Sequence, residues 1–280
     1  MKKLFAAFMM LGAIFIMNDA QAQQNNTKST WLWHTHTITD EQTIQFLIEK
    51  EVTTVYLQID PALPNDVYAV FINKMREANI EVQALDGGPN WNTVNFDALW
   101  AWISQYHQEY PGSRFTAVHL DVEPYLSVLW EQNRNLAVSQ YQELIQHARY
   151  KIQYSGLRLE VDVPFWYDEV LYYNQFGEGN LAEWVIANTD GVSIMAYRNT
   201  VAALKSITKN EMNYAKKYQT PVVIGVETMP FPDEPYITFA ADGEIKMNQV
   251  LDQVAGHYAK NRYFSGVGIH YVQSWQDLRQ

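Results

Sequence analysis

The sequence predicts a single-domain (β/α)8 TIM barrel, and three observations lead to this fold class. Eight short runs rich in β-branched and aromatic residues alternate with segments whose apolar residues recur at helical spacing. The strand candidates are almost continuously apolar, which is typical of parallel strands covered on both faces. Eight such units in about 250 residues match the usual size of this barrel. The 48% apolar content excludes a disordered chain.

The elements follow one another in strict alternation along the chain. The predicted strands are Thr30–His34, Thr54–Ile59, Glu81–Leu85, Ala117–Leu120, Arg158–Val163, Gly191–Ala196, Pro221–Val226 and Gly266–Tyr271. The predicted helices are Asp40–Glu51, Asp66–Ala78, Phe96–Tyr110, Ser139–Tyr154, Ala182–Ala187, Ser206–Tyr218 and Met247–Lys260, several opened by Asp, Ser or Thr caps. A doubly wound open sheet is the alternative, but no glycine-rich phosphate loop follows the first strand.

The N-terminal segment has the pattern of a secretory signal peptide. Lys2 and Lys3 precede an apolar run from Leu4 to Met17, and the small-x-small triplet ends at Ala22. The run is too short for a membrane span of about 20 residues. We therefore expect residues 1–22 to be removed, 23–29 to form a disordered lead and 30–280 to form the barrel. The mature protein is expected in the periplasm or outside the cell, with no membrane insertion.

The amino-acid composition excludes several kinds of catalytic group and ligand. The chain has no cysteine, which excludes thiolate metal sites and cysteine nucleophiles. Its formal net charge is −11, which argues against binding to nucleic acids or anionic membranes. A neutral or cationic ligand fits better, and the interpretation below requires no cofactor or metal.

Polar side chains close all eight predicted strands, at the end of the barrel where active sites of this fold lie. Aromatic residues follow them closely, and a rim of rings and carboxylates suits a sugar, so a glycan is the expected partner. The residues expected to bind substrate are His36, Asp60, Asp86, Trp91, Asp162, Trp166, Arg198, His270 and Trp275.

The fourth predicted strand carries the strongest catalytic signal. Alternate residues of a strand share a face, so His119, Asp121 and Glu123 are expected to point the same way. Two neighbouring carboxylates favour a proton held by one of them, as a general acid requires. Asp121 and Glu123 could alternatively ligate a metal or pair with Arg198.

A further carboxylate, Glu227, ends the seventh predicted strand. It could form a salt bridge with Arg198, or it could act as the nucleophile or base of a glycosidase pair. Separations of about 5 Å between the two carboxyl groups favour retention, and roughly 6.5–9.5 Å favour inversion.

The fourth strand resembles the signature of glycoside hydrolase family 18, the chitinase-like family, which has acids at the first, fourth, sixth and eighth positions of an eight-residue stretch. Here these positions are Thr116, His119, Asp121 and Glu123, so two acids remain. Met195-Ala-Tyr197 resembles the Met-x-Tyr of that family, whose Tyr assists the acetamido group of the substrate. This chain has Arg198 where the family usually has an acid, and Trp275 loosely resembles the Trp that floors its site.

Glu123-Pro124 and Glu227-Thr228 instead resemble the retaining β-glycosidase clan, although Val122 replaces the usual Asn before the first Glu. The mature chain as a whole also resembles secreted bacterial barrels without a characterised activity. These resemblances imply a glycosidase with Glu123 as proton donor, Asp121 as its partner, and either Glu227 or the substrate acetamido group, assisted by Tyr197, as nucleophile.

Two other hypotheses remain. His34-Thr35-His36 resembles the His-x-His of metal-dependent amidohydrolases, with Asp60, His119 or His270 completing a zinc site. Asp162, Tyr197 and His270 stand where that family has its Lys, His and Asp. A non-catalytic glycan-binding barrel is the third hypothesis, favoured by the missing acids at positions 116 and 119.

Overall fold

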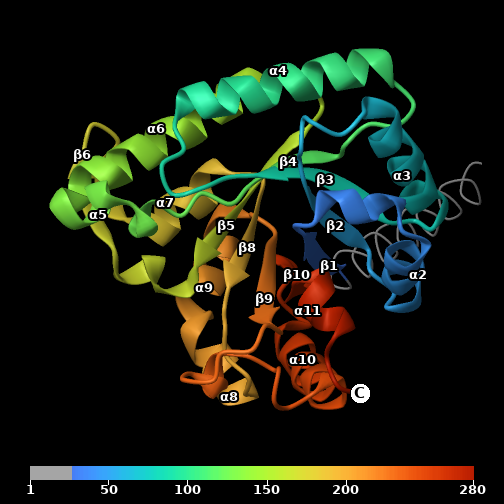
Figure 1. Ribbon diagram of the computed structural model, residues 1–280. Helices are drawn as coiled ribbons and strands as arrows, with labels where there is room; N and C mark the ends of the chain where they lie inside the picture. The colour runs from blue at the N-terminus through green and yellow to red at the C-terminus, as the bar shows by residue number, and fades with distance from the viewer. Residues whose placement is uncertain (1–26) are drawn as a thin grey trace, which may run out of the picture.

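The computed structural model describes residues 27–280, and within them eight parallel strands form a closed barrel (Figure 1). Around the barrel the strands neighbour one another in the order β1-β10-β9-β8-β5-β4-β3-β2. Their bounds are β1 Thr27–Leu32, β2 Thr54–Gln58, β3 Glu81–Asp86, β4 Ala117–Leu120, β5 Arg158–Pro164, β8 Gly191–Met195, β9 Val222–Glu227 and β10 Phe264–His270. The predicted (β/α)8 fold is thereby confirmed.

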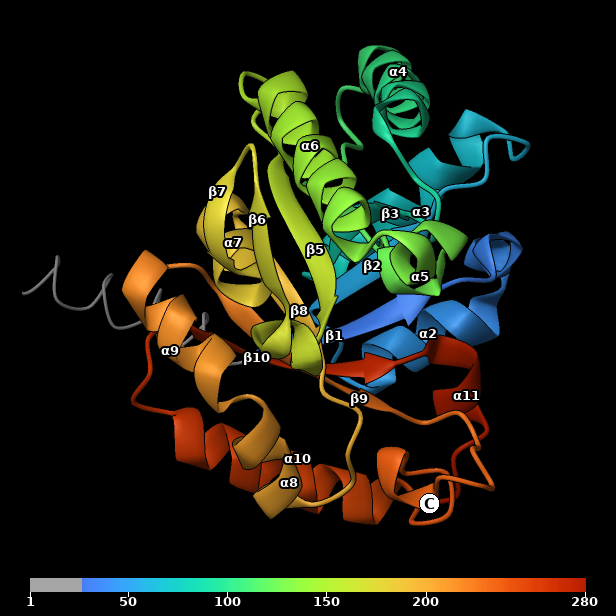
Figure 2. The same ribbon diagram turned by 90° about the vertical axis from the view of Figure 1, so that its left-hand side faces the viewer.

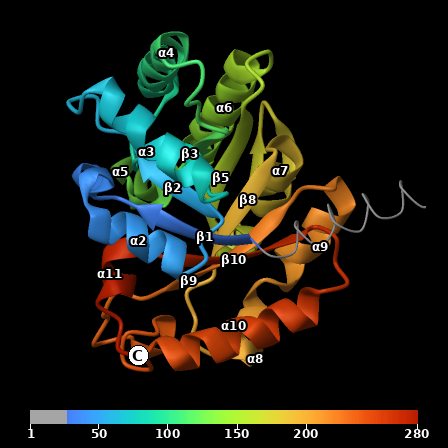
Figure 3. The same ribbon diagram turned by 90° about the vertical axis from the view of Figure 1, so that its right-hand side faces the viewer.

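Helices cover the outside of the barrel, as the three ribbon views show (Figures 1, 2 and 3). The α-helices are α2 Glu41–Glu49, α3 Asn65–Glu77, α4 Thr93–Glu109, α5 Val128–Gln132, α6 Arg134–Ile152, α7 Leu181–Asn188, α8 Val201–Ile207, α9 Lys209–Tyr218, α10 Glu244–Tyr258 and α11 Val272–Gln276. The short 3-10 helices of the described residues are η1 Thr35–Thr39, η2 Pro124–Leu126, η3 Phe165–Glu169 and η4 Pro235–Ile237. Among residues 27–280, no helix is both long and apolar enough to cross a bilayer.

The structure corrects several predicted boundaries. The predicted signal segment and positions 23–26 of the predicted lead lie outside the described residues, whereas Thr27, Lys28 and Ser29 pair with β10 as the start of β1. The predicted helix 206–218 is divided into α8 and α9. The hairpin of β6 Leu171–Asn174 and β7 Gly177–Asn180, between β5 and α7, was not predicted. Its alternation is too short to separate from loop sequence.

The core has two parts. The larger part lies between the strands and the surrounding helices, because near-continuous apolar strands present one face to them. A much smaller apolar cluster, Trp31, Tyr56 and Leu85, lies apart from it. Contacts between non-neighbouring strands place this cluster inside the barrel, since Tyr56 on β2 reaches Ser193 on β8 at 3.0 Å. The barrel interior therefore holds polar side chains such as Ser193 beside this small apolar cluster.

Candidate functional site

The candidate site lies at the mouth of the barrel, by which we mean the end formed by the carboxyl ends of the strands. There, the ends of β3 and β4 approach each other closely. The backbone N–H of Asp121 donates to the Asp86 carbonyl at 3.1 Å. Gly87 follows directly, and a Cβ atom placed there would lie 1.9 Å from the Asp121 carbonyl oxygen. Only glycine therefore allows β3 and β4 to deliver Asp86 and Asp121 at this spacing.

Burial shifts both Asp121 and Glu123 toward their protonated forms. Burial raises the pKa of Asp121 well above its usual range, and the carboxylates of Asp162 and Glu123 add to the effect. Asp121 Oδ1 is buried without a hydrogen-bond partner. Burial also raises the pKa of Glu123, the hydrogen bond from the Tyr125 hydroxyl lowers it, and the Asp162 carboxylate adds to the rise. The predicted like-charge pair thus behaves as a proton-holding site.

Tyr125 is a site residue that the sequence analysis missed. Its hydroxyl donates a hydrogen bond to Glu123 Oε1, and its ring packs edge-on against Trp166 with centroids 5.0 Å apart. Trp166 lies in η3 and also contacts Trp130. The signal was available in the sequence, because Tyr125 stands two positions after Glu123 in the alternating series.

Glu227 lies below the mouth rather than open to it. Its residue is 2% exposed, and Oε1 accepts hydrogen bonds from the backbone N–H groups of Thr228 and Met229, both at 2.7 Å. Oε2 accepts a hydrogen bond from His270 Nδ1 at 2.8 Å. Both oxygens of the carboxylate are therefore engaged, and the predicted salt bridge with Arg198 does not form.

His270, predicted to bind substrate, has both ring nitrogens occupied. Nδ1 contacts Glu227, and Nε2 accepts a hydrogen bond from Trp33 Nε1 at 2.9 Å. A nitrogen that accepts a hydrogen bond carries no proton, so this network assigns the neutral tautomer with the proton on Nδ1. The His270 ring also lies 5.8 Å from that of Tyr197.

Tyr197 and Arg198 follow β8 at the same rim and are partly buried. Burial, Glu227 and Asp121 raise the pKa of Tyr197 well above its usual range, so its hydroxyl remains a donor. The Arg198 guanidinium packs over the rings of Phe165 and Tyr236 at 4.8 and 5.4 Å. Among residues 27–280 it forms no ion pair with Asp121 or Glu123, contrary to the alternative in which these groups pair.

Asp162 is not a substrate-binding residue, because it is 1% exposed inside the barrel. Its Oδ2 accepts a hydrogen bond from Trp31 Nε1 at 2.8 Å, and Oδ1 lies 3.0 Å from His119 Nε2. Trp275 must also be removed from the predicted set. It is 2% exposed on α11, packs edge-on against Phe46 and donates to Glu244, on the outer side of the barrel wall.

The remaining predicted residues lie on loops of the mouth. His36 is exposed in η1, with its ring stacked 5.9 Å from that of His34. Asp60 is exposed and accepts from the Ala62 backbone. Burial raises the pKa of Asp86, which accepts a hydrogen bond from Gln58. Trp91, in the loop after β3, is partly buried against the core.

The ligand set of the zinc hypothesis does not converge. His36 in η1 and His34 directly before it are exposed, whereas His119 and His270 contact Asp162 and Glu227. Across residues 27–280, no three His, Asp or Glu side chains are grouped as a metal site requires.

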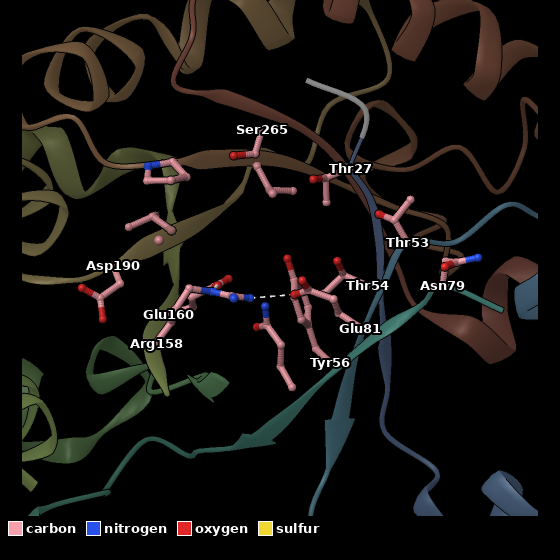
Figure 4. A pocket seen from close by; sticks show the side chains of 15 residues that line it. Thr27, Thr53, Thr54, Tyr56, Asn79, Glu81, Arg158, Glu160, Asp190 and Ser265 are labelled. Carbon is pink, nitrogen blue, oxygen red and sulfur yellow. Dashed lines mark hydrogen bonds and ion pairs between the residues drawn. The ribbon is translucent and has the colours of Figure 1, made fainter. Parts of the chain in front are cut away.

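A cavity of about 550 Å³ lies at the opposite end of the barrel, at the amino ends of the strands (Figure 4). Arg158 spans it by pairing with Glu81 at 2.7 Å and Glu160 at 2.8 Å, and Tyr56 points into it. Asp121, Glu123 and Tyr197 are not among its lining residues, so this cavity is distinct from the candidate site.

No family model and no curated protein sequence matches this chain. Solved structures do match. A family 18 chitinase from Pseudoalteromonas aurantia has a TM-score of 0.53 at 12% identity, covering 88% of this chain and 94% of that one. A class V chitinase mutant from Cycas revoluta, in complex with (GlcNAc)3, has a TM-score of 0.53 at 15% identity and covers 90% and 96%.

The spore cortex-lytic enzyme SleL of Bacillus megaterium has a TM-score of 0.55 at 14% identity, covering 92% of this chain and 75% of that one. At sequence identities of 12–15%, these matches show similarity of fold alone. The chain shares its fold, a (β/α)8 barrel closed by eight parallel strands, with these chitinases and with SleL.

Proposed function

We propose that this protein is a glycoside hydrolase that cleaves glycans containing N-acetylglucosamine. The observation that carries the proposal is the Asp121–Glu123 pair at the mouth, where burial and mutual repulsion favour a retained proton. The fold shared with chitinases supports it, as does the (GlcNAc)3 bound to the Cycas revoluta protein.

In this proposal Glu123 protonates the glycosidic oxygen. A general acid needs a pKa near the working pH, and burial moves the pKa of Glu123 upward toward it. The Tyr125 hydroxyl engages Oε1, which leaves Oε2 to carry the transferred proton. Trp166 and Tyr125 offer ring faces beside this carboxyl group, suited to the C–H faces of a sugar.

The nucleophile is the acetamido oxygen of the substrate rather than Glu227. A carboxylate that attacks an anomeric carbon must reach the sugar, but both oxygens of Glu227 already accept hydrogen bonds below the mouth. Asp121 and Tyr197 interact electrostatically and lie beside Glu123, where they can orient the acetamido group. Glu227 then acts as a positioning residue that holds His270.

The test is hydrolysis of N-acetylglucosamine oligomers compared with glucose oligomers of the same length. We expect turnover of the former only, because the latter lack the acetamido group. Glu123→Gln should lower kcat about 10²–10⁴-fold, the usual contribution of a general acid. Full activity of Glu123→Gln would refute the assignment.

Glu227→Gln separates the two routes. If Glu227 only positions His270, the variant should keep measurable turnover and the same preference for acetamido sugars. Cleavage of glucose oligomers by the wild type, with a trapped glycosyl–Glu227 intermediate, would establish direct covalent retention instead. Saturable binding of the oligomers without turnover would replace the hydrolase by the glycan-binding barrel.

We also propose that the protein acts outside the cytoplasm, on the basis of the signal pattern ending at Ala22. Mass spectrometry of the protein from a fractionated bacterial host should find an N-terminus at Gln23 in the exported fraction. Full-length protein confined to the cytoplasm would contradict export while leaving the proposed chemistry untouched.

A further inference from the structure

Two histidines at the site, the buried His119 and the partly buried His270, face different kinds of partner. His270 meets one acceptor, Glu227, and one donor, Trp33, which together assign a single ring proton. His119 meets oxygen on both sides: Nδ1 lies 2.9 Å from Gln83 Oε1, and Nε2 lies 3.0 Å from Asp162 Oδ1. The Nε2–Oδ1 contact has the distance of an ion pair but lacks hydrogen-bond alignment.

A proton must lie between His119 and Asp162. Both side chains are 0% exposed, so no solvent separates the lone pairs of Nε2 and Oδ1 at 3.0 Å. Without a proton, two acceptors would face each other in a medium where unpaired polar groups are costly. The Tyr56 ring, stacked on His119 with centroids 3.9 Å apart, offers a π face to a positively charged imidazole.

The proton between His119 and Asp162 affects the carboxyl groups at the mouth, because it changes the charge near them. Asp162 contributes to the rise in the pKa of both Asp121 and Glu123. The other titratable groups facing the pair come from several elements: Glu160 on β5, Tyr56 on β2, Tyr141 on α6 and Tyr197 after β8. Glu160 is already paired with Arg158 at 2.8 Å, whereas the ionisable group that contacts Asp162 and can carry a positive charge is His119.

We propose that His119 and Asp162 are positioning residues that hold one proton as a buried ion pair and thereby set the protonation of Asp121 and Glu123. This inference rests on the proposed function, because it assigns the pH range of the same site. In this chain His119 occupies the fourth position of the strand-four motif, and the carboxylate that it contacts, Asp162, comes from the neighbouring strand β5.

The proposal predicts opposite shifts for the two single variants. His119→Gln removes the cation and leaves Asp162 uncompensated, so the pKa of the Glu123–Asp121 pair rises. The alkaline limb of the kcat profile should then move up by about one pH unit, the lower end of the effect of a nearby charge. Asp162→Asn should move it down. KM should change less than about twofold, and the double variant should return the limb close to the wild-type position.

A matched control is His147→Gln, which makes the same change at a His–Asp contact of 2.8 Å between α6 and α4 on the outer surface. Its pH profile should equal that of the wild type. Thermal unfolding is measured for every variant. A lower Tm for His119→Gln with an unmoved alkaline limb would overturn the proposal, since it would reduce the pair to a packing role.

A second measurement needs no substrate. Nitrogen-15 NMR of histidine-labelled wild type at neutral pH should show two protonated ring nitrogens for His119 and one for His270, assigned by the single variants. A His119 ring with an unprotonated Nε2, together with a profile unmoved in His119→Gln, would overturn the ion pair. If the wild type hydrolyses no glycan, the proposed function fails, whereas the NMR result still decides whether the pair holds the proton.

Discussion

Gly87→Ala tests whether the close approach of β3 and β4 controls the catalytic geometry. The added Cβ would lie 1.9 Å from the Asp121 carbonyl oxygen and 2.3 Å from its carbon, where real contacts stay above 3.0 Å. Because both obstructing atoms belong to the backbone, no rotamer change relieves them. The end of β4 must therefore move by about 1 Å, carrying Asp121 and Glu123 with it.

A displacement of about 1 Å at a catalytic group can cost about 10²-fold in rate. We therefore expect kcat of Gly87→Ala to fall about 100-fold on the substrate that the wild type cleaves. Overpacking of this kind should also lower the free energy of unfolding by about 1–3 kcal/mol. Steady-state kinetics and chemical denaturation measure the two effects separately.

Gly256→Ala is the matched control, because this glycine lies in α10 with open space around its Cβ position. It should keep full activity and gain about 0.5–1 kcal/mol of stability from the helix propensity of alanine. Wild-type kcat for Gly87→Ala would refute the reasoning, since it would mean that the position of Asp121 is not set by this contact.

Two further predictions concern buried residues away from the mouth. Glu211 in α9 is fully buried, and burial raises its pKa to about 8. The folded state then binds more protons than the unfolded state between about pH 4.5 and 8, so stability falls as pH rises through this range, by up to about 1.4 kcal/mol per unit. Denaturation across this range should show a flatter profile for Glu211→Gln, and an unchanged slope would contradict the assignment. Trp275→Ala should lower the free energy of unfolding by about 3–5 kcal/mol while leaving KM unchanged, because this ring packs against Phe46 outside the mouth. A raised KM in folded Trp275→Ala would return this residue to the substrate site.

Much of the fold was predictable because the local spacing of apolar residues distinguishes strands from helices. Apolar runs bounded by polar segments located all eight barrel strands, with five of the eight starting at the predicted residue. The division of 206–218 into α8 and α9 was not predictable, since Thr208 ends one helix and begins the next while the apolar spacing continues. The hairpin β6–β7 was missed for a similar local reason.

The site was predictable where one strand carries it. His119 lies in β4, and Asp121 and Glu123 follow the strand directly. The sequence could predict this series because alternate residues of an extended chain share a face. Trp275 was misassigned because α11 begins at Val272, directly after β10, and turns the ring outward onto Phe46. The predicted strand ended at Tyr271 and β10 ends at His270, and a one-residue difference of this kind is beyond what sequence spacing resolves.

By itself, the sequence determined a barrel of eight alternating units and a carboxylate pair at the end of its fourth strand, because strand and helix periods are properties of neighbouring residues. Only the tertiary structure decided the partners: His119 with Asp162, and Glu227 with His270. Each of these pairs joins residues more than 40 positions apart in the sequence, on two neighbouring parallel strands of the barrel. The physical reason is that strand pairing brings these side chains into contact in the barrel interior, where each must find a partner for its hydrogen bonds or its charge.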